Sequence, residues 1–253
     1  MVNKLTILKL GGSVITKKSK ALTFNRNSVE KLSNVIKKFN EPLIIVHGAG
    51  SFGHYYAKRY GISSKPTRST KHVVKIRDSM QSLNHKIVEI FHQNGVNTFS
   101  FSPIYMYHNR KIPNIWKNTL QKSISFDLVP MTFGDVLLSN NGFYIHSGDL
   151  IVYDLCKLLN PKRVVFASNI DGIYQNLDDN SSLVPIIKNN KNNLKFSKIN
   201  YDVTGGIKTK ITQSLKIANL GIEVQITNGL NSKNLIKALK GEHIGTLFIG
   251  DKH

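Results

Sequence analysis

Short apolar runs alternate with amphipathic stretches along nearly the whole chain. Apolar runs of this length, bounded by polar residues or glycine, are typical of buried β-strands. We expect strands at Leu5–Leu10, Leu43–Val46, Thr98–Phe101, Leu128–Thr132, Val164–Ala167, Val224–Thr227 and Thr246–Ile249. The amphipathic stretches predict helices at Ser28–Phe39, Val73–Asn94, Ser147–Leu159, Gly206–Leu220 and Asn234–Leu239.

The clearest helical pattern is Val73–Asn94, where apolar residues recur at intervals of three and four and Gly95 follows at the end. Met80, Leu83 and Ile87 belong to this stripe, and we expect them to be core residues. The alternation of strands and helices predicts an α/β fold with a mainly parallel sheet. In such sheets, ligands bind beyond the carboxyl ends of the strands.

Two stretches depart from this rhythm. Val136–Ile145 is predicted to form a β-hairpin, because Asn141-Gly142 suits a tight primed turn. The polar, asparagine-rich segment 178–197 is predicted to be an exposed excursion. We expect one domain over residues 1–253, with a weak boundary near Asn160-Pro161 that divides it into lobes 1–160 and 161–253.

Composition excludes some classes of protein and leaves others open. No apolar run is long enough to span a membrane, and no secretory pattern is present at the N-terminus. Cys156 is the one cysteine, so no internal disulfide can form, which fits the cytoplasm; it lies in a helical apolar pattern and is predicted to be buried. The net charge of +20 favours anionic partners such as nucleic acid, acidic membranes or phosphorylated metabolites. The basic residues are scattered, so the charge alone does not identify the partner.

The first glycine turn, Lys9-Leu10-Gly11-Gly12-Ser13, follows the first strand. Two glycines let backbone amides approach an anion closely and permit positive φ angles. A purely structural turn explains the pattern equally well. The spacing does not match an ordinary P-loop.

The second glycine turn, His47-Gly48-Ala49-Gly50-Ser51-Phe52-Gly53-His54, joins the second strand to a predicted helix. Such a turn brings amides and the positive end of a helix to one point, which makes a phosphate site. It is not the dinucleotide fingerprint, because the spacing differs. His54 lies within reach of whatever these amides hold, so we interpret it as a ligand.

Three later segments carry further candidates. Ser147-Gly148-Asp149 opens a helix; Ser147 or Asp149 caps it, or Asp149 orients nearby lysines. Asp171-Gly172 is either a plain turn or a loop along a nucleotide. In Val203–Ile211 a third glycine pair precedes a helix, and of Lys208 and Lys210 only one is expected to point into the site.

These segments, in this order, resemble the amino acid kinase family, and within it most closely the isopentenyl phosphate kinases of the archaeal type. The resemblance rests on Lys9–Lys18, His47–His54, Gly134-Asp135, Ser147–Asp149, Asp171-Gly172 and Val203–Lys210. The histidine after the second glycine turn is its most specific element, shared with fosfomycin kinase. The resemblance implies a three-layer αβα sandwich around an open, mainly parallel sheet. It also implies transfer of phosphate from ATP, with Mg²⁺, to isopentenyl phosphate in isoprenoid biosynthesis, and a homodimer.

The resemblance also implies roles for individual residues. The catalytic residues it implies are Lys9, Lys18, His54 and Asp149, with Asp149 organising the lysines. It implies acceptor binding, in the N-terminal lobe, by Ala49, Gly50, Gly53, His54 and Gly148. It implies nucleotide binding, with ATP in the C-terminal lobe, by Lys9, Gly11, Gly12, Ser13, Asp171, Gly172, Gly205, Gly206 and Lys210.

Three positions depart from the family pattern: Ile207 replaces a usual methionine, Asn169 a frequent aspartate, and Leu150 a frequent polar or acidic residue. The last two bear on nucleotide or metal coordination and not on the reaction class. A phosphate acceptor is already anionic, so the reaction needs charge neutralisation more than a strong base. We therefore expect Mg²⁺ bridging phosphates and water, without a dedicated protein cage.

Two alternatives remain at this level. The chain is a kinase of another small anion in the same superfamily, such as a phosphonate of the fosfomycin type. More remotely, it is a nucleic-acid-binding protein, as the charge of +20 suggests, although basic and aromatic residues are not interleaved and no binding motif is present.

Overall fold

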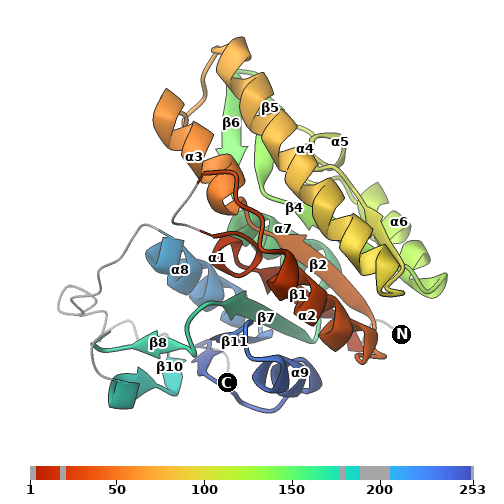
Figure 1. The fold of residues 1–253 in the computed structure, drawn as a ribbon, viewed down its shortest axis with the longest axis vertical. Helices are drawn as coiled ribbons and strands as arrows, with labels where there is room; N and C mark the ends of the chain where they lie inside the picture. Colours follow the sequence, from red (N-terminus) through yellow and green to blue (C-terminus); the bar gives the residue numbers. More distant parts are fainter. Residues whose placement is uncertain (1–3, 18–20, 177–179, 189–205, 252–253) are drawn as a thin grey trace.

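An eight-stranded sheet forms the centre of the molecule in the computed structural model, which describes residues 4–17, 21–176, 180–188 and 206–251 (Figure 1). The strand order is β10-β12-β11-β7-β1-β2-β4-β3, and all these neighbours are parallel except β11 and β12. The strands are β1 Thr6–Leu10, β2 Leu43–His47, β3 Thr98–Ser100, β4 Val129–Phe133, β7 Arg163–Ser168, β10 Ile186–Lys188, β11 Glu223–Asn228 and β12 Thr246–Ile249.

Helices cover both faces of this sheet, which makes the predicted αβα sandwich. The described helices are α1 Gly12–Ile15, α2 Arg26–Lys37, α3 Gly50–Tyr60, α4 Thr70–Gln93, α5 Pro103–Met106, α6 Ile115–Ser125, α7 Gly148–Leu159, α8 Gly206–Ala218 and α9 Ser232–Lys240, with a 3₁₀ turn at Asn180–Ser182. None of the helices in the described ranges is long and apolar enough to cross a membrane.

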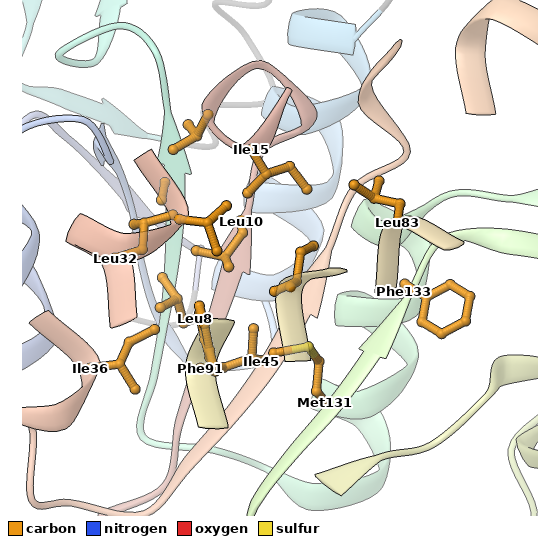
Figure 2. Packing of buried hydrophobic residues seen from close by; sticks show 14 of the residues in the cluster. Leu8, Leu10, Ile15, Leu32, Ile36, Ile45, Leu83, Phe91, Met131 and Phe133 are labelled. Atoms are coloured by element: carbon orange, nitrogen blue, oxygen red, sulfur yellow. The ribbon is translucent and has the colours of Figure 1, made fainter. Parts of the chain in front are cut away.

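Two apolar clusters hold the layers together, one on each face of the sheet. Leu8, Leu10 and Ile45 pack against α2, α3, α4 and α9 on one face, as Figure 2 shows for part of this cluster. Ile7, Ile44 and Val46 alternate with them along β1 and β2 and pack against α5, α6, α7 and α8 on the other face. Because both faces are covered, apolar residues on the central strands point to both sides of the sheet. Met80, Leu83, Ile87 and Cys156 are buried core residues, as predicted.

Hydrogen bonds from four glycine amides link the carboxyl ends of five neighbouring strands, just past the last residues of the regular ladder. Gly134 donates to the carbonyl of His47, Gly48 to Leu10, Gly11 to Ala167 and Gly229 to Ser168, at 2.7–3.1 Å. These bonds place the residues that follow β1, β2, β4 and β7 side by side at one edge. The candidate segments named above therefore lie next to one another.

All seven predicted strands and all five predicted helices are confirmed, with shifted ends. The hairpin is confirmed as β5 Asp135–Ser139 and β6 Gly142–His146. The predicted primed turn at Asn141-Gly142 is wrong, because Gly142 pairs with Ser139 and the turn residues Asn140 and Asn141 both lack a positive φ. The expected excursion at 178–197 is partly wrong in its described part, 180–188, because β10 forms an edge of the main sheet and β9 Leu183–Val184 pairs with β8 Ile173–Tyr174. The rest of that segment lies outside the described residues. Helices α1, α5 and α6 were not predicted from the sequence, and α1 and α5 span a single turn each.

Candidate active site

Two lysines share one buried carboxylate at the carboxyl edge of the sheet. The side chain of Lys9 leaves β1 on the face covered by α7 and α8, and Lys9 is only 6% exposed. Its Nζ lies 2.8 Å from Oδ1 of Asp149, the second residue of α7. The Nζ of Lys210, from α8, lies 3.6 Å from the same oxygen and above the ring of Phe166. The predicted role of Asp149, to organise lysines, agrees with this geometry.

Burial and charge compete at this cluster. Burial alone would raise the pKa of Asp149, but the ammonium groups of Lys210 and Lys9 outweigh it and lower the pKa to about 2. Burial lowers the pKa of Lys210 to about 8; Asp149 opposes this shift and Lys9 adds to it. Asp149 therefore stays ionised at neutral pH between two cations. The cluster carries one positive charge more than its carboxylate balances, which favours a bound anion.

The first two glycine turns touch each other and offer amides to that anion. A Cβ on Gly12 would collide with the backbone nitrogen and Cα of Gly50. Within the described part of the chain, the amides of Gly12, Ser13, Ala49 and Gly50 donate to no acceptor. Two adjacent helix starts, α1 and α3, thus present four amide donors at one place.

Close backbone approach, and not positive φ, explains the first glycine pair. Gly11 has φ −62°, and a Cβ there would lie 2.7 Å from the carbonyl oxygen of Ala167. The Gly11 amide donates to that carbonyl, so of the two glycines only Gly12 offers its amide. Positive φ occurs instead at Gly50, φ +50°, where Thr16 crowds the position of a Cβ.

Gly48 and Gly148 line the path of the Lys9 side chain. A Cβ on Gly48 would lie 3.2 Å from Nζ of Lys9, and one on Gly148 would lie 3.5 Å from its Cε. The side chain of Lys9 passes these two glycines and reaches Asp149, because neither glycine carries a side chain that would crowd it. Gly148, predicted to bind the acceptor, therefore lies beside the cluster.

His54 lies in the second turn of α3 and is exposed, beyond the Ala49 and Gly50 amides. Gly53, in contrast, is buried, and its amide donates to the carbonyl of Ala49 at 3.1 Å. A Cβ on Gly53 would meet the Met80 sulfur at 2.9 Å, so this glycine allows α3 to approach α4. Gly53 therefore has a packing role, and its predicted contact with the acceptor stays a prediction.

The loop after β7 holds Asp171 and Gly172 near the end of β11. Asp171 accepts from the Asn228 side chain at 3.0 Å and from the Tyr174 hydroxyl at 3.2 Å. Gly172 is buried, and a Cβ there would lie 2.6 Å from Oγ1 of Thr246. This loop is separate in sequence from the lysine cluster but lies at the same edge of the sheet, because β7 is next to β1.

Of the remaining predicted residues, Lys18 and Gly205 lie outside the described part of the chain, and Gly206 is the first residue of α8. Lys210 is buried in the cluster and Lys208 is exposed, so the two lysines do point in different directions. In the described ranges, no group of three or more His, Cys, Asp or Glu side chains could hold a metal ion.

Two buried polar residues next to the site were named in the sequence motifs but received no role there. His47, the last residue of β2, is 0% exposed and stacks on Phe133. Asp135, at the start of the hairpin, pairs with Arg77 of α4 at 2.7 Å. Burial raises the pKa of Asp135 to about 7, against the opposing effects of the Val136 amide and Arg77. A polar residue that ends an apolar strand was the available signal for His47.

An open, mainly parallel sheet with helices on both faces, and with lysines and amides gathered at its carboxyl edge, defines an α/β protein that binds phosphate groups. The chain belongs to the amino acid kinase family, whose sequence model matches residues 4–228. It is 29% identical to the isopentenyl phosphate kinase of Thermoplasma acidophilum over 96% of this chain and 99% of the relative. It is 30% identical to the isopentenyl phosphate kinase of Methanothermobacter thermautotrophicus over 98% of this chain and 100% of the relative.

A solved structure supports the same relationship. The product complex of the T. acidophilum isopentenyl phosphate kinase superposes with a TM-score of 0.81 at 26% identity, covering 97% of this chain and 100% of that one. The similarity therefore extends over nearly the whole chain, including the first two glycine turns.

Proposed function

We propose that this protein is a phosphotransferase that uses ATP to convert isopentenyl phosphate to isopentenyl diphosphate, a step of isoprenoid biosynthesis. The buried Lys9–Asp149–Lys210 cluster beside four amide donors carries this proposal, because it suits two phosphate groups brought together. The isopentenyl phosphate kinases to which the chain is similar over nearly its full length support the choice of acceptor.

In this reaction an anionic oxygen of the acceptor phosphate attacks the γ-phosphorus of ATP. The new P–O bond forms as the bond from the γ-phosphorus to the β,γ-bridging oxygen breaks, and ADP leaves with that electron pair. Lys9 stabilises the charge on the transferring phosphoryl group, and Lys18 is the second lysine assigned there. Lys210 and the Gly12 and Ser13 amides hold the nucleotide phosphates. Asp149 keeps the two buried ammonium groups in place.

His54, with the amides of Ala49 and Gly50, is assigned to the acceptor phosphate, and Gly148 to the wall between acceptor and Lys9. The nucleotide extends toward Asp171, Gly172, Gly205 and Gly206. Residues 1–160 then supply most of the acceptor side and residues 161–253 most of the nucleotide side. Figure 1 shows α3, α4 and the hairpin β5–β6 at one end of the molecule, and β8 and β10 at the other.

We infer that Mg²⁺ accompanies ATP and neutralises its phosphates. The carboxylates at the site are already engaged, Asp149 by two lysines and Asp171 by Asn228 and Tyr174. The donor set therefore fits an ion held mainly by phosphate oxygens and water.

We further propose a cytoplasmic homodimer. The face formed by the edge strand β3 and helix α6 supports this proposal: Phe99 is 50% exposed and Ile115 71% exposed, next to the rings of Phe101 and Trp116, which pack edge to face. Sedimentation should give a dimer, and Phe99→Glu should weaken it. A wild-type monomer at micromolar concentration would contradict the proposal.

A substrate panel tests the proposed activity. ADP release is measured by a coupled assay with isopentenyl phosphate, fosfomycin, acetylglutamate and uridine monophosphate, each with and without Mg²⁺. We expect turnover of isopentenyl phosphate that is far more efficient than that of the other three. Preference for fosfomycin would move the protein to the phosphonate branch, and no turnover of isopentenyl phosphate would overturn the proposal.

A further inference from the structure

His47 is a buried polar residue beside the site that the proposed reaction does not use. It ends β2, it is 0% exposed, and its ring stacks on Phe133 with centroids 5.1 Å apart. Its Nδ1 lies 3.0 Å from the carbonyl oxygen of Gly48, the next residue. Its Nε2 lies 3.3 Å from Oδ1 of the side-chain amide of Asn84 on α4.

The protonation state of the ring follows from its surroundings. Burial lowers the pKa of His47 to about 4, against the hydrogen bonds to Gly48 and Asn84, and Lys9 lowers it further. The ring is therefore neutral at pH 7 and carries one N–H group. The Gly48 carbonyl can only accept a hydrogen bond. The side-chain amide of Asn84, in contrast, can donate one to Nε2 if it rotates by half a turn, which exchanges the places of Oδ1 and Nδ2. Ser100, which contacts that amide at 2.7 Å, can donate or accept. The neutral ring satisfies all these groups only when Nδ1 carries the proton.

The bond from Nδ1 controls the direction of a peptide group. The Gly48 amide donates to the carbonyl of Leu10, so both polar groups of Gly48 are held, one by β1 and one by His47. The described peptide bonds are trans. In a trans peptide the carbonyl and the following amide point in opposite directions. Because the Gly48 carbonyl points to the buried ring, the Ala49 amide points away from the ring. Within the described chain, the Ala49 amide donates to no acceptor.

We propose that His47 is a positioning residue that draws the Gly48 carbonyl away from the acceptor anion and thereby directs the Ala49 amide toward it. This inference rests on the proposed function, in which Ala49 binds the acceptor phosphate. Without the His47 bond, the peptide can turn and present a carbonyl oxygen, which repels phosphate. His47 thus acts on acceptor binding and not on ATP.

Three substitutions separate this role from packing. The side-chain nitrogen of asparagine can occupy the place of Nδ1, whereas that of glutamine reaches the place of Nε2, and phenylalanine keeps only the ring. We expect His47→Asn to keep the KM for isopentenyl phosphate within about threefold of wild type. We expect His47→Gln and His47→Phe to raise it about tenfold, with the KM for ATP changed less than twofold. Equal losses in all three variants, or equal effects on both substrates, would overturn the proposal.

A second measurement needs only the wild-type protein. In ¹⁵N-histidine NMR spectra, His47, assigned by the contact of its ring protons with the ring of Phe133, should show a protonated Nδ1 and a bare Nε2 from pH 8 to pH 5.5. A protonated Nε2 or a doubly protonated ring would overturn the inference even if a variant fails to fold. If the wild type does not use isopentenyl phosphate, the proposed function fails separately. The KM comparison is then made with whichever anion of the panel is turned over.

Discussion

At the scale of residues, Lys9 and Lys210 share one oxygen of Asp149 in a place that water scarcely reaches. Two buried cations with one anion are poorly compensated until a phosphate group arrives. The excess positive charge of the cluster thus destabilises the folded enzyme when the site is empty and stabilises the complex when a phosphate group is bound. Because of this difference, the site gains free energy when the negatively charged transition state forms in it.

The pKa of Lys210 predicts how ATP binding depends on pH. Lys210 is charged below pH 8 and neutral above it, because burial lowers its pKa to about 8. We expect kcat/KM for ATP to fall as the pH rises through about 8, since this ratio reports the free enzyme. The arginine of Lys210→Arg stays charged, so the fall of kcat/KM on the alkaline side of the pH profile should move to higher pH. An unchanged alkaline limb in Lys210→Arg would show that another group causes it. Lys208→Arg, on the exposed side of α8, is the matched control.

His54 provides the residue-scale test of the acceptor side. His54→Ala should lower kcat/KM for isopentenyl phosphate about a hundredfold, because it removes a hydrogen bond to a charged phosphate. The melting temperature should change little, since His54 is exposed. His85→Ala is the control, because His85 is also an exposed histidine on a neighbouring helix, α4. Activity of His54→Ala close to wild type would remove this residue from the site.

At the scale of elements, the two ends of α3 carry glycines with similar φ angles and different surroundings. Gly50, at φ +50°, is crowded by Thr16, whereas at Gly61, with φ +63°, no atom lies within 4 Å of the place that a Cβ would take. Alanine should cost about 1–2 kcal/mol of strain at either position. Only at Gly50 must the backbone also move, which displaces the amides of both glycine turns.

We therefore predict that Gly50→Ala and Gly61→Ala lose similar backbone stability but differ in catalysis. Urea unfolding should show that both are destabilised, with Gly50→Ala the more so. Gly61→Ala should keep the kinetic constants of the wild type, and Gly50→Ala should lose at least about tenfold in kcat/KM for both substrates. Comparable activity of the two variants would mean that the turns tolerate movement and that their contact is not required.

Elements with strong periodicity were predictable from the sequence, and short or marginal ones were not. α4 has an apolar stripe over its whole length, and its existence followed from that pattern alone. α1 has four residues, too few for a period to show, and α6 buries only Leu120. β10 was missed because its residues are mostly exposed and it is held at the sheet edge by pairing with β12.

The site was predictable to a similar degree. Lys9, Asp149 and the glycine turns were found because each follows a strand or opens a helix. Their arrangement as one cluster depends on strand order, which places β1 between β2 and β7 and which no local pattern reveals. The role of Gly11 as a close-packed residue, and that of His47, depend on contacts between strands that are distant in sequence.

At the scale of the whole molecule, the net charge of +20 surrounds a site for two anions. A field of this sign raises the rate at which anionic substrates arrive, and salt weakens it because the Debye length is about 10 Å at 0.1 M. The buried lysine cluster is screened much less. Substrate capture and the chemical step should therefore respond differently to salt.

We predict that kcat/KM for isopentenyl phosphate falls several-fold between about 20 mM and 200 mM NaCl, while kcat changes less than twofold. The measurement is a steady-state series at constant Mg²⁺, repeated with potassium acetate to exclude a specific effect of chloride. The same field should bind a DNA duplex weakly, and filter binding should show that 200 mM salt abolishes this interaction. A kcat/KM that is independent of salt would mean that the scattered lysines do not steer the substrate. DNA binding that persists at 200 mM salt would show that the surface charge serves a nucleic-acid partner in addition to the kinase site.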